Sequence, residues 1–245
     1  FMFGWNAYND ITDIEIDRTN RPGRPLPSGR LNLKEATNAM RGSLVLSVSF
    51  LIIGAMNLSD SITDGEVIVS VAIWVAAVFL LISYEGIRGS KGLKHRGLAG
   101  NVAIASAIGM DVLFGASSVS GTTDPKVISL AVMAILLSLA RELIKDIEDM
   151  EGDVGRNTLP RKIGVDNARS IAWIFTLAAF ISLFLPFILE VFPTEHAILV
   201  APGGLLLMLV KSKLFVGEDR AAQSLIKRSL QVSMIGIIAS AVIIG

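Results

Sequence analysis

The chain of 245 residues contains no cysteine and only two histidines, His95 and His196. The missing thiols exclude disulfides, thiolate metal sites and a cysteine nucleophile, and the two distant histidines do not suggest a histidine-based metal site. Charged residues make up only 18% of the chain, fewer than a soluble domain of this size carries. The 22 basic and 22 acidic residues cancel, so there is no net charge to attract nucleic acid, and we expect no nucleic-acid partner.

Apolar residues make up 52% of the chain, and they fall in long runs. Each run is close to the roughly 20 residues that a helix needs to cross a bilayer. The runs predict seven complete membrane spans, at residues 36–58, 66–84, 98–118, 126–145, 167–190, 196–213 and 226–245. We therefore predict an all-α, polytopic transmembrane helical bundle, organised as a single integral-membrane domain over residues 1–245.

The ends of these spans differ in charge. The loops that follow Asp10, Tyr84, Asp146 and Val210 are rich in lysine and arginine, whereas the alternate loops are acidic, with Lys126 as their only base. Because basic loops stay on the cytoplasmic side, we expect a multi-pass protein of the cell membrane with these loops facing the cytoplasm. The chain opens inside an apolar segment, which we interpret as the cytoplasmic end of a spanning helix whose start is missing.

An acidic motif, N-D-I-T-D-I-E-I-D, occupies residues 9–17. Its aspartates, Asp10, Asp13 and Asp17, are spaced i, i+3 and i+7, so in a helix they share one face. Hard divalent cations such as Mg²⁺ prefer these oxygen ligands and are usually shared with the phosphates of a substrate. The motif predicts a metal–phosphate site, and the alternative is a solvated acidic helix end.

A second run, from Arg141 to Asp153, places Asp146, Asp149 and Asp153 at the same spacing, again at the end of an apolar span. This repetition indicates a two-fold repeated architecture in which both acid sets converge on one cavity. Arg141 and Lys145 share the acidic face of that helix, either to bind a substrate anion or only to neutralise the neighbouring acids.

Basic residues lie close to both motifs. The loop over residues 18–30 contains prolines and Gly23, which predict that no helix continues. It carries four arginines suited to a polyanion, Arg18, Arg21, Arg24 and Arg30. Lys94 lies near the end of another span. It either binds a phosphate as a point charge or is an ordinary basic residue of a cytoplasmic loop. Asp111 lies deep in a span, where a carboxylate is either functional or hydrogen-bonded structurally.

Four segments in order carry a family resemblance: Asn9-Asp10-x-x-Asp13-x-x-x-Asp17, Arg-Pro-Leu-Pro, Lys94 to Gly100-Asn101, and Asp146-x-x-Asp149-x-x-x-Asp153. Together they resemble the intramembrane prenyltransferases of the UbiA type. The resemblance implies a nine-helix fold of which the first helix and most of the second are absent here. The run from Arg141 to Asp153 is most similar to the archaeal digeranylgeranylglyceryl phosphate synthases, which attach a geranylgeranyl chain to geranylgeranylglyceryl phosphate in ether-lipid synthesis.

The resemblance also implies roles for individual residues. Two Mg²⁺ ions and the donor diphosphate would be held by Asn9, Asp10, Asp13, Asp17, Asp146, Asp149 and Asp153. Substrate anions would be bound by Arg18, Arg21, Arg24, Lys94, Asn101, Arg141 and Lys145. Among these, Arg18, Arg21 and Arg24 would either help to bind the diphosphate or bind the phosphate of the acceptor. Asp13, Asp149 and Lys145 would be the central catalytic residues.

Several alternatives stay open at this point. The proton of the acceptor hydroxyl has three candidate destinations: the released diphosphate, Asp13 and Asp149. The partners implied are a polyprenyl diphosphate donor, membrane lipids and a lipid-phosphate acceptor, whereas other members of the superfamily act on an aromatic quinone precursor or a porphyrin. A cation transporter would instead carry its acids near mid-membrane and use broken helices. No obligate protein partner is evident.

Overall fold

The computed structural model describes residues 1–58, 64–86, 91–117, 122–152 and 155–244, and these residues form helices without any β-strand. The helices are α1 (Met2–Thr12), α2 (Ile14–Asn20), α3 (Leu33–Leu58), α4 (Asp64–Glu85), η1 (Leu93–His95), α5 (Leu98–Ser117), α6 (Pro125–Glu148), α7 (Leu159–Ile163), α8 (Val165–Ile188), η2 (Thr194–His196), α9 (Ala197–Phe215) and α10 (Asp219–Ile244). The all-α prediction is confirmed.

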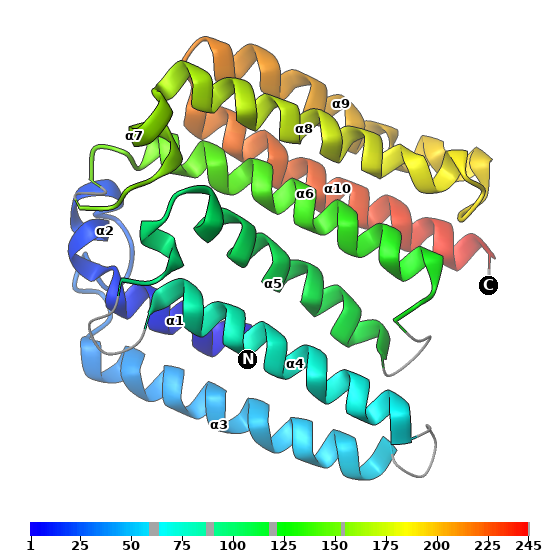
Figure 1. Cartoon of the computed structure of the whole chain (residues 1–245), viewed down its shortest axis with the longest axis horizontal. Helices are drawn as coiled ribbons and strands as arrows, with labels where there is room; N and C mark the ends of the chain where they lie inside the picture. Colours follow the sequence, from blue (N-terminus) through cyan, green and yellow to red (C-terminus); the bar gives the residue numbers. More distant parts are fainter. Residues whose placement is uncertain (59–63, 87–90, 118–121, 153–154, 245) are drawn as a thin grey trace.

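Seven of the described helices, α3 to α6 and α8 to α10, are long enough and apolar enough to cross a membrane. The predicted number of spans is therefore confirmed, and Figure 1 shows these helices side by side in one bundle. Several begin or end beyond the apolar run itself. At the start of α6, for example, Asp124 accepts a hydrogen bond from the backbone of Lys126 at 2.8 Å, with Pro125 in the first turn, a favourable N-terminus.

The helix α6 lies at the centre of the bundle and packs against α5, α8 and α10. Its residues Ala140, Leu143 and Ile144 are fully buried. The helix α3 is much less buried than α6, because large side chains such as Phe50 and Met56 are about 70% exposed. An apolar surface of this kind is suited to lipid rather than to water. The most deeply buried of the seven long helices thus carries the second acidic motif at its end.

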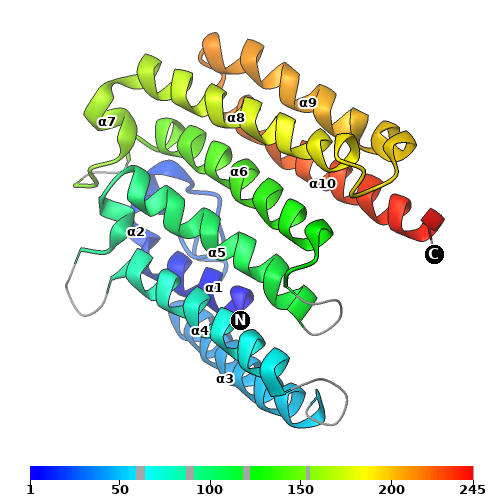
Figure 2. The ribbon, with the colours of Figure 1, turned by 45° about the vertical axis from the view of Figure 1, so that its right-hand side comes forward.

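Both acidic motifs lie at the same end of the bundle, together with α2 and α7 (Figures 1 and 2). The connections from α4 to α5, from α6 to α7 and from α9 to α10 meet at this end too. These are the segments in which the basic residues concentrate. Residues far apart in sequence can therefore form one charged cluster.

Two local predictions were wrong. Asp10, Asp13 and Asp17 do not share one continuous helix, because α1 ends at Thr12 and α2 begins at Ile14. The Thr12 hydroxyl donates to the Asn9 carbonyl at 2.9 Å, the same oxygen that accepts from the Asp13 backbone, and such competition bends helices. The proline-containing loop also begins later than predicted, because Arg18 still belongs to α2.

Candidate active site

The second aspartate of each motif occupies the same backbone position. Asp13 follows the last residue of α1, and Asp149 follows the last residue of α6. Their φ and ψ angles are nearly equal, −96° and 10° against −87° and 0°. Each backbone N–H donates to the residue four positions earlier, Asn9 and Lys145, at 2.9 and 2.8 Å. The sequence repeat is therefore also a repeat of local structure.

Each motif pairs with an arginine that follows the other motif, an arrangement called the arginine exchange below. Arg21, which follows the first motif, donates through Nη2 to both carboxylate oxygens of Asp149 at 3.0 and 2.9 Å. Arg156, which follows the second motif, donates to Asp13 at 2.8 Å. These pairs join residues 128 and 143 positions apart in the chain. These contacts bring the segments around the two motifs together, whereas the common cavity predicted from the repeat stays a prediction.

A close approach of backbone segments supports the exchange. The Asn20 amide donates to the Asp149 carbonyl at 3.3 Å. A Cβ added at Gly152 would come within 1.9 Å of the Asn20 side chain, so a larger residue there would displace the amide that donates to Asp149.

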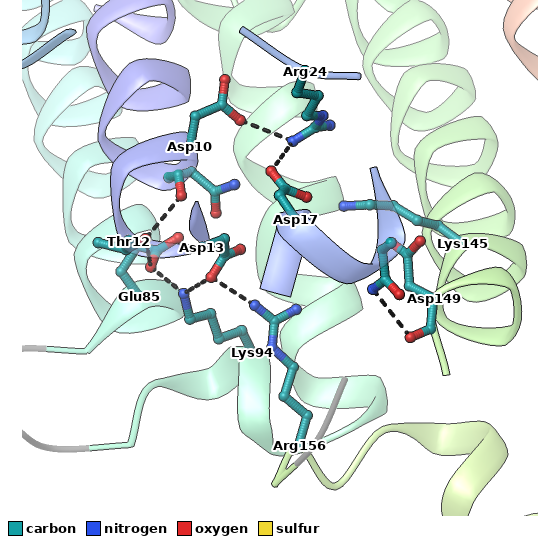
Figure 3. Close-up of polar contacts among 12 residues, drawn as sticks. Asp10, Thr12, Asp13, Asp17, Arg24, Glu85, Lys94, Lys145, Asp149 and Arg156 are labelled. Atoms are coloured by element: carbon teal, nitrogen blue, oxygen red, sulfur yellow. Dashed lines mark hydrogen bonds and ion pairs between the residues drawn. The ribbon is translucent and has the colours of Figure 1, made fainter. Parts of the chain in front are cut away.

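Asp13 is held by two cations (Figure 3). Lys94 donates to it at 2.9 Å and Arg156 at 2.8 Å. Lys94 also pairs at 2.5 Å with Glu85, a carboxylate whose side chain is only 2% exposed. Burial opposes ionisation of Asp13, but the charges of Arg156 and Lys94 outweigh it and hold the pKa of Asp13 below its ordinary value. The two basic side chains therefore favour the ionised form of Asp13.

The other two aspartates of the first motif share one arginine. Arg24 donates through Nη1 to Asp10 at 3.0 Å and to Asp17 at 2.6 Å. Asp17 is buried, whereas Asp10 is half-exposed. Burial raises the pKa of Asp10, and the charge of Arg24 opposes that shift only in part.

The cations around the second motif make fewer direct ion pairs with its central aspartate. Burial raises the pKa of Asp149 even though Arg21 and Lys145 act to lower it. Asp146 accepts a hydrogen bond from the Asn101 side chain at 2.9 Å. Lys145 lies 3.5 Å from Glu142, which is also 2.6 Å from Arg141. A buried glutamate therefore holds both of the predicted anion-binding residues of α6.

The structure brings most of the predicted site residues together, and these are Asp10, Asp13, Asp17, Arg21, Arg24, Lys94, Asn101, Arg141, Lys145, Asp146 and Asp149. Arg18 instead pairs with Glu15 on an exposed face of α2. Asn9 takes part through its backbone carbonyl. Asp153 lies outside the described residues. Asp111 is exposed on α5 and borders a cavity of about 490 Å³ with Phe1 and Trp74, apart from both motifs.

Sequence reasoning missed three charged residues, Glu85, Glu142 and Arg156. Glu85 and Glu142 stand at the ends of apolar runs, where acidic residues ordinarily mark the boundary of a span. Arg156 lies in a loop with several other basic residues, where its charge is explained by topology alone. A carboxylate placed directly beside a predicted anion-binding residue, as Glu142 is beside Arg141, was the one available signal.

The donor set suits Mg²⁺, because it consists of carboxylate and amide oxygens. Within the described ranges, however, no three acidic or histidine side chains come close enough to hold one ion. The first triplet is divided, since Asp10 and Asp17 share Arg24 whereas Asp13 binds Lys94 and Arg156. Each aspartate is thus balanced by a basic side chain.

The known proteins that resemble this chain point to one family. The sequence profile described as the UbiA prenyltransferase family matches residues 1–233. Relatives named digeranylgeranylglyceryl phosphate synthase include those of Haloquadratum walsbyi, 33% identical over 93% of this chain and 74% of the relative, and Methanosarcina mazei, 36% identical over 96% of this chain and 76% of the relative. The relative from Methanopyrus kandleri is 30% identical over 97% of this chain and 82% of its own length.

A solved structure described as giving structural and mechanistic insights into digeranylgeranylglyceryl phosphate synthase in membranes is similar as well. It is 32% identical, with a TM-score of 0.62, over 98% of this chain and 80% of that chain. The resemblance predicted from the four motif segments is confirmed. The chain belongs to the UbiA prenyltransferase family.

Proposed function

We propose that this protein transfers the geranylgeranyl group of geranylgeranyl diphosphate to geranylgeranylglyceryl phosphate and releases diphosphate. The observation that carries the proposal is the reciprocal pairing of Arg21 with Asp149 and of Arg156 with Asp13, which builds one charged site from two acidic motifs. The relatives named for this reaction cover most of the chain and supply the choice of donor and acceptor.

Asp10, Asp13, Asp17, Asp146 and Asp149 would hold Mg²⁺ together with the donor diphosphate, with Asn9 and Asp153 beside them. When bound, the metal neutralises the negative charge that develops on the leaving diphosphate. Lys94 and Arg156, which are 8% and 11% exposed in their side chains, would donate to diphosphate oxygens from the other side. Their low exposure strengthens each charge interaction relative to the same pair in water.

The bond changes are simple. The allylic carbon–oxygen bond of the donor breaks, and its electron pair leaves on the diphosphate. The hydroxyl oxygen of the acceptor forms the new ether bond to that carbon, and its proton passes to the released diphosphate, to Asp13 or to Asp149. Apolar walls of the bundle would exclude water from the electron-poor carbon, which would otherwise be hydrolysed.

We also propose that the charged end of the bundle faces the cytoplasm, because the basic loops gather there. The chain has no cysteine, so Ser28→Cys places a unique thiol in the exposed loop before α3. In vesicles of known orientation, a membrane-impermeant thiol reagent should label it from the cytoplasmic side. Labelling from the opposite side alone would reverse the proposed orientation.

An acceptor screen tests the reaction. Protein in detergent or nanodiscs is supplied with Mg²⁺, geranylgeranyl diphosphate and one acceptor, and diphosphate release is measured. We expect turnover with geranylgeranylglyceryl phosphate, dependent on Mg²⁺ and abolished by a chelator. Turnover with an aromatic acid and none with the lipid phosphate would reject the proposed acceptor while keeping the family.

A further inference from the structure

A pocket of about 330 Å³ lies beside the first acidic motif, between α1, the proline-containing loop and the start of α3. Its polar wall consists of Asp10, Asp17 and Arg24, and its apolar wall includes Phe3, Leu26 and Ala39. The site described above explains the three charged residues only as part of the metal–diphosphate cluster. It leaves the apolar wall without a role.

The pocket changes from apolar to charged along α1. Phe3, Ala7 and Asp10 line it at helical spacing, so they share one face of α1 and extend over about 10 Å of its length. Phe3 at one end is 71% exposed, and Asp10 at the other end reaches Arg24. This arrangement suits an amphiphile whose charged head lies at Arg24 and whose chain extends past Phe3.

Arg24 has donors available for an anion. Both of its hydrogen bonds, to Asp10 and to Asp17, use the single nitrogen Nη1. Nε and Nη2 make no hydrogen bond with any residue of the described ranges. The side chain is 34% exposed, and it lies on the pocket wall. The Nε–Nη2 edge of a guanidinium is the edge that binds a phosphate in a two-pronged manner.

The proposed reaction, on which this inference rests, joins two substrates that both carry phosphate. Two anions brought this close repel each other unless each has its own cation. The structure offers cations on two sides of the motif. Figure 3 shows Arg24 approaching from one side, and Lys94 and Arg156 approaching Asp13 from the other.

We propose that this pocket binds the acceptor lipid, with its phosphate monoester on the Nε–Nη2 edge of Arg24 and the first part of its chain along Phe3, Leu26 and Ala39. The donor diphosphate is left to Lys94, Arg156 and the metal-binding aspartates. The hydroxyl that reacts lies only two carbons from the acceptor's phosphate, so a phosphate held at Arg24 keeps it beside the first motif.

Filling the apolar wall tests the pocket without touching a charged residue. Ala39 is exposed on α3, so Ala39→Phe adds volume at the pocket wall without overpacking a core. The matched control is Val45→Phe, on the same helix, 65% exposed and outside this pocket. We expect Ala39→Phe to raise the KM for geranylgeranylglyceryl phosphate about tenfold, the order of loss typical when one apolar contact of a substrate is lost. The KM for the donor should stay within about twofold in both variants.

A second variant tests the phosphate contact by direct binding, with no turnover required. Arg24→Lys keeps the charge but loses the two-pronged edge. We expect it to weaken binding of geranylgeranylglyceryl phosphate about tenfold. Binding of geranylgeranylglycerol, which lacks the phosphate, should not change. Inorganic phosphate should compete with the lipid only weakly, because it does not use the apolar wall.

The outcomes separate the two proposals. Unchanged lipid binding in Ala39→Phe, or a raised KM for the donor in place of the acceptor, would overturn the pocket assignment. Equal weakening of the lipid and of its phosphate-free analogue by Arg24→Lys would overturn the phosphate contact. The third outcome is lipid binding that Ala39→Phe weakens, with no turnover in the wild-type protein. It would overturn the proposed reaction and keep the binding site.

Discussion

The two acidic motifs share their spacing and their backbone geometry, yet their central aspartates have opposite electrostatics. Asp13 lies between Lys94 and Arg156, which hold its pKa low in spite of burial. Asp149 pairs with Arg21, and burial prevails and raises its pKa. Identical local structure therefore does not produce identical chemistry. The difference comes from side chains that other segments bring to each aspartate.

The arginine exchange links the two motifs electrostatically. Arg21 leaves the first motif and neutralises the second, and Arg156 does the reverse. Each motif is thus neutralised in part by an arginine from the segment that follows the other motif. The second cation at Asp13 is Lys94, which forms a direct ion pair with it at 2.9 Å. The second cation at Asp149 is Lys145, whose charge acts on Asp149 without a direct ion pair among the described residues. The first half thus holds its central aspartate by one more direct ion pair.

Removing the aspartates should produce the largest effect. Asp13→Ala and Asp149→Ala each take away a carboxylate from a site that stabilises developing charge, and we expect diphosphate release to fall at least about a hundredfold in both. Glu15→Ala is the control, because Glu15 is exposed and its ion pair in the described part of the chain is with Arg18, which is exposed as well. Near-normal rates in either aspartate variant would show that the site does not need both halves.

Breaking the arginine exchange should have an intermediate effect. Arg21→Gln and Arg156→Gln each remove charge-assisted hydrogen bonds to a buried aspartate, and we expect activity to fall about tenfold to a hundredfold. Arg18→Gln serves as the control on α2, and it should retain wild-type activity. If Arg21→Gln behaves like Arg18→Gln, the contact between the halves has no functional role.

Substitution of the buried glutamates should have the smallest effect, which we expect on stability. The loss of stability should be larger for Glu85, beside the first motif, than for Glu142, beside the second. Glu85→Gln removes an anion that is 2% exposed and 2.5 Å from Lys94, so we expect the free energy of unfolding to fall by about 2 kcal/mol. Glu142→Gln should cost less, because its partners Arg141 and Lys145 are 37% and 27% exposed and water screens them. Thermal unfolding in detergent measures both, and an equal or reversed order would contradict the proposed asymmetry.

Much of the fold could be predicted because its causes are local. A run of apolar residues near the length of a bilayer has few alternatives to a spanning helix, and all seven such runs form long helices. The repeated aspartate spacing, together with the Arg-Pro-Leu-Pro and Lys94 to Asn101 segments, identified the family and predicted the candidate site. The break at Asp13 was not foreseen, because it depends on a hydrogen bond of Thr12 that competes with the helix.

By itself, the sequence determined the helical spans, the two acidic motifs at one end of the bundle and the family. These follow from composition and from spacing over a few turns of helix. Only the tertiary structure decided which cation each aspartate receives, because the pairs Arg156–Asp13, Lys94–Asp13 and Arg21–Asp149 span 143, 81 and 128 residues. An ion pair depends on distance and burial rather than on order in the chain. The packing of α2 against the end of α6 therefore turns two similar motifs into one unequal site.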